Sequence, residues 1–180
     1  MSNETRFYFD NQPDCPVKAA GLLLRRWRNG QAEYMIQERR YLNDGYTKPS
    51  WIPKQVWHHL SHFTLFEDFG GKVESCDTSI FDIMVRECQE ESNGVLNPMT
   101  IRERLNSRHA RFFYSRRSQY VLAILPATPD ETHLSTDDFG ACEEHLRYHI
   151  ERRVKWMSAK ELKKMGWFLH CRIQHVFQSI

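Results

Sequence analysis

Residues 71–95 have the sequence GKVESCDTSIFDIMVRECQEESNGV, and this stretch decides the fold. From Ser79 to Ser92, apolar residues recur at the three- and four-residue spacing of an amphipathic helix. They are Ile80, Ile83, Met84 and Cys88. Asn93-Gly94 follows, and these two residue types best tolerate the left-handed conformation that ends a helix. The sequence therefore predicts a helix from Ser79 to Ser92 with a well-marked end.

Three glutamates, Glu87, Glu90 and Glu91, share one face of this predicted helix because they are three and four residues apart. Like charges so close repel each other unless a cation joins them. Carboxylate oxygens suit hard divalent ions such as Mg²⁺ or Mn²⁺. Gly70-Gly71 precedes the helix and allows a backbone carbonyl to approach the same ion. The residues indicate a metal site, and a solvated helix face is the alternative.

The same stretch resembles the Nudix box, whose pattern is Gly, five residues, Glu, seven residues and Arg-Glu-apolar-x-Glu-Glu-x-Gly-apolar. The matching positions are Gly71, Asp77, Arg86, Glu87, Glu90 and Glu91. Asp77 stands where the pattern has its first glutamate. Gly71 lies fifteen residues before Arg86 instead of fourteen, so one residue is inserted. Asn93-Gly94-Val95 replaces the closing glycine and apolar residue, and Asn tolerates the left-handed cap.

The surrounding sequence also resembles the Nudix family. Residues 19–40, AAGLLLRRWRNGQAEYMIQERR, look like its opening hairpin, and residues 152–162, RRVKWMSAKEL, look like the strand that leads to its last helix. The resemblance covers about residues 17–165. It implies an α+β fold, an α/β/α sandwich in which a mixed β-sheet packs between helices. The order of strands, one helix, strands and a closing helix favours the same class.

The resemblance implies a Mg²⁺-dependent (or Mn²⁺-dependent) hydrolase that cleaves the diphosphate linkage of a nucleoside di- or triphosphate, or of a nucleoside-diphosphate derivative. A metal-activated water would attack phosphorus. By position, the expected metal ligands are Glu87, Glu90, Glu91 and the Gly70 carbonyl. Glu87 or Glu90 is expected to orient or deprotonate water. Arg86 is expected to organise the catalytic site by pairing with Asp77 or a glutamate.

Candidate substrate-binding residues lie around this motif. Lys72 and Glu74 flank the glycine turn, where they are placed to contact phosphate and metal, and Trp51 lies in an aromatic loop. Arg116 belongs to a basic run, which suits a polyphosphate tail or RNA because guanidinium binds phosphate oxygens. The run comprises Arg102, Arg104, Arg108, Arg111, Arg116 and Arg117. Solvated surface charge, and for Trp51 a place in the core, are the alternatives.

The rest of the chain predicts strands, turns and helices around this centre. Strands are expected at Val17–Trp27 and Ala32–Gln37, joined by Arg28-Asn29-Gly30, and at Arg111–Tyr114, Gln119–Leu125 and Glu151–Met157. Helices are expected at Met99–Arg108, at Ala141–Tyr148 and after the capping residue Ser158. Arg39–Pro53 and Pro126–Phe139 have loop composition. A further acid from outside the motif is expected at Glu143, Glu144 or Glu151.

Composition bounds the class of protein. A length of 180 residues suits one domain, expected at residues 17–180 after an N-terminal arm of residues 1–16. A net charge of +2 is too small for a dedicated nucleic-acid binder. Five cysteines without a CxxC pair favour reduced thiols, and a zinc site at His58, His59 and His62 lacks partners at ligand spacing.

Location and partners are bounded less tightly. No apolar run approaches a membrane span, and Met1–Asp14 is unlike a secretory signal, so we expect a cytoplasmic protein, with the nucleus also open. The expected partner is a nucleotide-like small molecule. RNA, as in mRNA decapping, a nucleotide sugar, and a catalytically silent nucleotide-binding module are the alternatives. The family resemblance also leaves a homodimer open.

Overall fold

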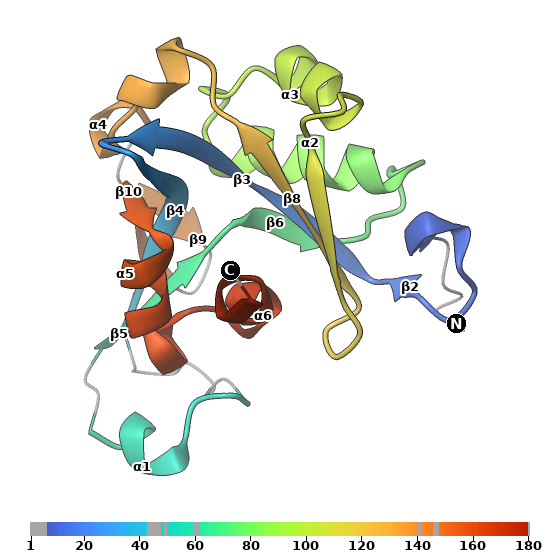
Figure 1. The fold of residues 1–180 in the computed structure, drawn as a ribbon. Coiled ribbons are helices and arrows are strands. Elements are labelled where there is room, and N and C mark those ends of the chain that lie inside the picture. Colours follow the sequence, from blue (N-terminus) through green and yellow to red (C-terminus); the bar gives the residue numbers. More distant parts are fainter. Residues whose placement is uncertain are drawn as a thin grey trace. The chain divides into compact units, whose positions relative to one another are not determined.

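The structure of the chain is a computed structural model that describes residues 7–42, 48, 50–59, 62–139, 142–145 and 148–179 (Figure 1). The chain forms two compact units. One comprises Met1–Arg26 with Asp68–His133, and the other comprises Trp27–Glu67 with Leu134–Ile180. The expectation of a single domain over residues 17–180 stays a prediction.

The first unit contains a sheet of four strands in the order β6 (Phe69–Lys72), β3 (Ala19–Arg28), β8 (Tyr120–Pro126) and β7 (Arg111–Ser115). Strand β3 is antiparallel to β6 and parallel to β8, while β8 is antiparallel to β7. The central strands are continuous apolar runs and are buried. The predicted α+β class with a mixed β-sheet is confirmed.

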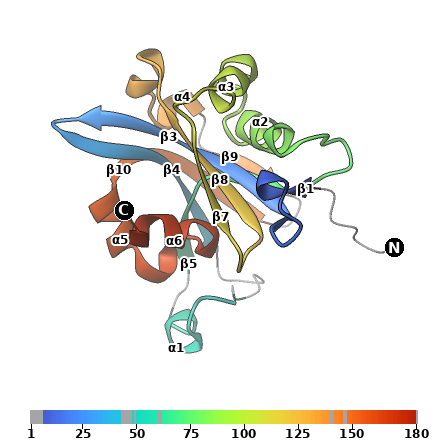
Figure 2. The same cartoon turned by 45° about the vertical axis from the view of Figure 1, so that its right-hand side comes forward.

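Helix α2 (Ile80–Glu91) lies next to α3 (Pro98–Leu105) in both views of the ribbon (Figures 1 and 2). The Ser79 hydroxyl caps α2 by accepting from the Asp82 N–H. Beyond α2, Asn93 and Gly94 have φ values of 52° and 74°, and the Gly94 N–H donates to the Gln89 carbonyl at 2.8 Å. The helix predicted from Ser79 to Ser92 is therefore confirmed at both ends.

The N-terminal segment of the first unit is folded. Strand β1 (Phe7–Tyr8) pairs with β2 (Pro16–Val17), and a 3₁₀ turn η1 (Phe9–Asn11) lies between them. The segment is fastened to β7 at Tyr114, whose hydroxyl donates to the Pro16 carbonyl at 2.7 Å. This segment supplies one wall of a cavity that is considered below.

The second unit contains four antiparallel strands in the order β5 (His62–Glu67), β4 (Gln31–Leu42), β10 (Tyr148–Ser158) and β9 (Cys142–His145). Its helical elements are α1 (Lys54–Trp57), α4 (Thr136–Phe139), α5 (Ala159–Lys164), the 3₁₀ helix η3 (Gly166–Phe168) and α6 (Cys171–Ser179). Ser158 and Glu161 form the capping box that starts α5, as predicted for Ser158. In the described part of the chain, no helix combines the length and apolar character that crossing a bilayer requires.

Three sequence-based expectations are wrong, and one helix was not predicted. Within the helix expected at Ala141–Tyr148, the described residues form strand β9 and the start of β10, since the ladder with β10 outweighs the helix propensity of the glutamates. Arg39 to Leu42, expected to begin a loop, are the end of strand β4. The region Pro126–Phe139 contains α4 and the 3₁₀ helix η2 (Asp130–His133). Helix α6 has no counterpart among the predicted elements.

Acid is expected to destabilise the second unit through His170, whose ring packs 4.5 Å from that of Trp51. Burial, and then the charge of Arg172, lowers the pKa of His170 from 6.5 to about 3, although the Glu67 carboxylate opposes this shift. Between these values only the unfolded chain takes up a proton. Stability that is fully present above pH 6.5 is therefore lost as the pH falls, by up to about 2 kcal/mol at pH 5.

Urea denaturation at pH 7 and pH 5 tests this expectation on the protein and on His170→Gln. The variant should lose less stability between the two pH values. A change in the variant's stability at pH 7 does not affect the test, because only the loss of stability between pH 7 and pH 5 is compared. Glu67 has a lowered pKa, since Arg39 and Arg172 outweigh its burial, so its contribution is lost only at lower pH. Equal losses in both proteins would contradict the assignment to His170.

Candidate active site

Gly71 and Glu87 meet where β6 passes α2 in the first unit. A Cβ built on Gly71 would fall within the carboxyl group of Glu87, so the absence of a side chain at Gly71 lets this carboxylate lie against the backbone. The Glu87 side chain is only 13% exposed. The glycine bend and the helix therefore hold one carboxylate between them.

Glu91 and Glu90 lie on either side of that contact. The Gly70 N–H donates to Glu91 Oε2 at 2.9 Å, which ties the last turn of α2 to the glycine bend. Glu90 is 60% exposed, and its Oε2 is 3.4 Å from Arg86 Nη1. Two of the three predicted glutamates are thus fastened at the bend, while the third faces solvent.

Arg86 connects the loop to the helix. Its Nε and Nη2 donate to the two carboxylate oxygens of Asp77 at 3.1 and 3.2 Å, and Nη2 also donates to the Lys72 carbonyl at 2.9 Å. Nη1 donates to Glu87 Oε1 at 2.8 Å. Burial opposes the charge of Arg86, but hydrogen bonds to Asp77 and Glu87 outweigh it and raise its pKa. The pairing predicted for Arg86 is present.

Asp77 also closes the turn that begins at Glu74. Its side chain is buried, and Oδ2 accepts from the Glu74 N–H at 2.6 Å, while the Asp77 N–H donates to the Glu74 carbonyl at 3.2 Å. The shorter carboxylate therefore serves as a hydrogen-bond acceptor for the loop and as a partner for Arg86. Five residues separate Gly71 from Asp77, as in the pattern, so the extra residue lies between Asp77 and Arg86.

Tyr120 and Asp68 form a buried pair behind the glycine bend, and sequence reasoning missed them. The Tyr120 hydroxyl donates to Asp68 Oδ2, and both side chains are almost fully buried. A Cβ on Gly21 or Gly70 would collide with this hydroxyl. The only signal in the sequence was an aspartate immediately before an apolar residue and two glycines. The Tyr120–Asp68 pair occupies the space that side chains at Gly21 and Gly70 would fill, so β3 and β6 approach closely here.

The other predicted substrate-binding residues are spread over both units. Lys72 is exposed, and Glu74 is 60% exposed with Oε1 3.6 Å from Arg86 Nη1. Arg116 is exposed and pairs with Asp14 at 3.0 Å. Trp51 lies in the second unit, where it packs against the core that contains Ile52. Their roles in binding stay predictions.

The arginine run is partly structural. Arg104 forms a bidentate pair with Glu131, at 2.6 and 2.7 Å, and donates to the Pro126 carbonyl at 2.8 Å. Arg102 pairs with Asp82. These two arginines therefore anchor α3 instead of forming an open phosphate-binding face. The side chains of the acids suggested outside the motif, Glu143, Glu144 and Glu151, lie outside the described residues.

The atoms at the glycine bend that could bind a metal are carboxylate and backbone carbonyl oxygens, the ligand type that hard divalent cations prefer. The cradle at Gly71 is shaped for a carboxylate. Within the ranges that the structure describes, no three His, Cys, Asp or Glu side chains are gathered as a ready ligand set for a metal. Exposed Glu90 is the carboxylate with room to turn toward an ion.

Comparison with known proteins found similar solved structures. No protein-family model matches it, and no curated protein matches it in sequence. Its structure is similar to a solved Ap4A hydrolase from C. elegans in a binary complex, with 16% identity, a TM-score of 0.43 and coverage of 90% of this chain and 93% of the other. It is also similar to the NUDIX domain of NrtR from Shewanella oneidensis complexed with ADP ribose, with 13% identity, a TM-score of 0.42 and coverage of 91% and 85%.

Proposed function

We propose that the chain is a Nudix hydrolase that cleaves the diphosphate linkage of a nucleoside di- or triphosphate, or of a nucleoside-diphosphate derivative, with residues 17–180 acting as one domain. The observation that carries the proposal is the Glu87 carboxylate held against Gly71 while Arg86 ties it to Asp77. These are residues of the motif recognised in the sequence. Their contacts join the loop to the helix.

Glu87, Glu90, Glu91 and the Gly70 carbonyl would hold a Mg²⁺ or Mn²⁺ ion. When bound, such an ion lowers the pKa of a coordinated water and offsets charge on the transferred phosphoryl group. Gly70 also donates its N–H to Glu91, and this hydrogen bond orients that carboxylate. The protein thus supplies hard oxygen ligands from one bend and one helix.

Side chains of the motif would orient the carboxylates, accept the proton of the attacking water and bind a phosphate. Arg86 orients Glu87 by donating to Oε1 at 2.8 Å and leaves the exposed Glu90 more loosely held at 3.4 Å. Glu87 or Glu90 accepts the proton of the attacking water. Lys72, which is exposed at the end of β6, is placed to pair with a phosphate oxygen of the substrate.

A catalytically silent nucleotide-binding module is the alternative from another class. A module that only binds has no need to gather Glu87 and Glu91 at one bend, where their charges repel each other. RNA as substrate rests on the arginine run, and two of its members are occupied by Asp82 and Glu131. Cleavage of a small nucleotide is therefore the function that we propose.

A substrate panel with metal removal tests the proposal. Nucleoside triphosphates, nucleotide sugars, dinucleoside polyphosphates and capped RNA are incubated with the protein and Mg²⁺ or Mn²⁺, and released phosphate, pyrophosphate and mononucleotide are measured. We expect turnover of at least one small nucleotide. It should fall to background when EDTA removes the ion and return with excess Mg²⁺, because water activation needs the ion. Turnover that is indifferent to EDTA, or absent throughout the panel, would refute the proposal.

A further inference from the structure

An open cavity of about 610 Å³ lies in the first unit between the N-terminal segment and the start of α2. In both views the blue N-terminal segment lies beside the green loop that leads into α2 (Figures 1 and 2). Phe7, Tyr8 and Phe81 give the cavity aromatic walls, and Asn11, Thr78 and Ser79 add neutral polar groups. None of the described residues that line it is charged.

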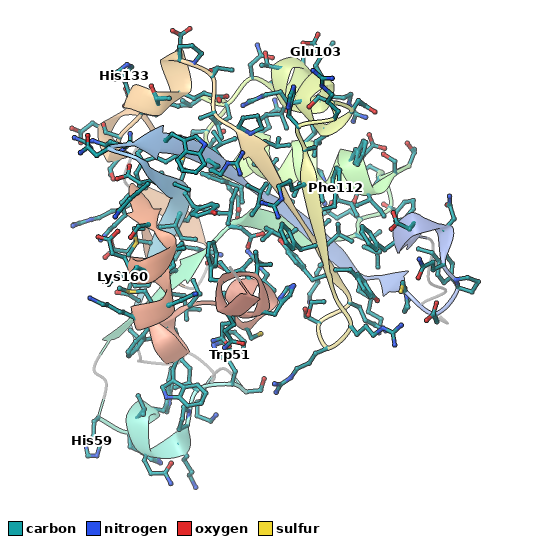
Figure 3. The ribbon with its side chains drawn as sticks, in the orientation of Figure 1. Trp51, His59, Glu103, Phe112, His133 and Lys160 are labelled. Carbon is teal, nitrogen blue, oxygen red and sulfur yellow. The ribbon has the colours of Figure 1, made fainter. Side chains whose placement is uncertain are left out.

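Both walls are anchored on β7. Phe81 stacks on Phe112, with ring centroids 5.7 Å apart and 12° between the ring planes, and Figure 3 labels Phe112. Opposite, Phe9 stacks on Tyr114 at 5.5 Å and 7°. The hydroxyl of Tyr114 also donates to the Pro16 carbonyl. Since one short strand holds both walls, the space between them is preformed, and a ligand would lose little free energy in ordering it.

A left-handed turn at Asp10 and Asn11 forms one wall of the cavity. Asp10 and Asn11 have φ values of 50° and 55°, in the left-handed region that Asp and Asn tolerate best among residues with a side chain. Hydrogen bonds of 2.9 Å, from Phe9 N–H to the Cys15 carbonyl and from Cys15 N–H to the Gln12 carbonyl, hold this turn. Here the turn brings Asn11 to the cavity.

We propose that this cavity binds the nucleobase of the substrate nucleotide, an inference that rests on the function proposed above. Aromatic walls provide faces on which a planar heteroaromatic ring stacks, and stacking accepts any base. The amide of Asn11 offers a donor and an acceptor to the edge of a base. The neutral lining suits a base and does not suit a phosphate, which seeks cationic partners.

The cavity lies at a suitable distance from the glycine bend. Ser79 caps α2, and Glu87 lies eight residues, a little over two turns, further along the chain, at roughly 12 Å of rise. A nucleotide whose base occupies the cavity can therefore extend its diphosphate along α2 toward Glu87. Thr78 and Ser79 directly follow Asp77, which Arg86 holds, so the cavity and the candidate active site share one loop.

Nucleoside binding without phosphate or metal tests the inference directly. Adenosine, guanosine, cytidine and uridine are titrated into the full chain in EDTA, and binding is followed by ligand-observed NMR. We expect at least one nucleoside to bind. Tyr8→Ala should weaken its binding about tenfold or more, because base stacking on an aromatic wall is lost. Tyr8→Phe keeps the ring and should bind like the unaltered protein. Tyr8 is 40% exposed, so neither change threatens folding.

Matched measurements separate this inference from the proposed function. Met99→Ala is the control, because Met99 is an exposed apolar residue on α3 outside the cavity. With a substrate found in the panel, Tyr8→Ala should raise KM about tenfold with kcat nearly unchanged, since the base lies far from the reacting phosphorus. Unchanged nucleoside affinity and KM in Tyr8→Ala, or no nucleoside binding at all, would overturn the inference. Metal-dependent turnover would then still support the proposed function.

Discussion

Glu87→Gln is expected to lower turnover by about a hundredfold to a thousandfold, as the loss of one charge-stabilising group in an active site does. Glutamine has the shape of glutamate, so it can still lie against Gly71 and accept from Arg86 Nη1. It lacks the negative charge that a divalent cation requires. The loss should therefore appear in kcat and in the metal concentration needed for half-maximal activity, with little change in the thermal midpoint.

Glu103→Gln is the matched control for this variant. Glu103 is an exposed glutamate on α3, in the same unit as α2, and it is labelled in Figure 3. The control removes an equal charge away from the glycine bend and should keep full turnover and metal dependence. Steady-state kinetics across Mg²⁺ concentrations distinguish the two variants. Turnover in Glu87→Gln equal to that in Glu103→Gln would show that Glu87 holds no metal.

Gly71→Ala is expected to abolish most activity with a small loss of stability. The added methyl group would occupy the space of the Glu87 carboxyl, which is the far end of a flexible side chain and can swing away. The backbone at Gly71 does not have a positive φ, so alanine itself is tolerated. The carboxylate would be displaced from its contact with the bend. Turnover should fall about as far as in Glu87→Gln, while the urea midpoint changes little.

Two further variants show whether Gly71→Ala acts through Glu87. In the double variant Gly71→Ala/Glu87→Gln, the losses should not add, because both changes remove the same carboxylate from the same place. Gly70→Ala should behave differently, since its methyl group would meet the Gly21 Cα at 2.6 Å and the Ala20 carbonyl at 2.7 Å. Backbone cannot move aside cheaply, so this variant should lose stability first. Additive losses in the double variant would place the effect of Gly71→Ala elsewhere.

The sequence predicted those helices and strands whose formation depends on residues close together in the chain. The apolar spacing between Ser79 and Ser92 predicted α2, and the pair Asn93-Gly94 marked its end. The strands β7 and β8 followed from their apolar runs. Strand β9 was predicted as a helix, because its pairing with β10 depends on a partner and leaves no trace in the residues themselves.

The candidate site likewise contains residues that the sequence predicted and residues that only the structure revealed. Spacing along one helix was enough to name Glu87, Glu90 and Glu91, since residues three and four apart share a face. Spacing along the helix does not tell which of these glutamates contacts the glycine bend. The structure fastens Glu91 to Gly70 and leaves Glu90 exposed. The Asp68–Tyr120 pair behind Gly70 was beyond prediction, because its members are 52 residues apart in the chain.

The sequence by itself determined the α2 helix, its acidic face and the glycine bend before it, because each depends on residues close together in the chain. Only the tertiary structure decided that Gly71 lies against the Glu87 carboxylate and that Arg104 forms an ion pair with Glu131. It also decided that the N-terminal segment forms one wall of the cavity beside α2. These contacts join segments distant in the chain. Their free energy comes from burial and charge pairing, which exist only once the sheet has brought the segments together.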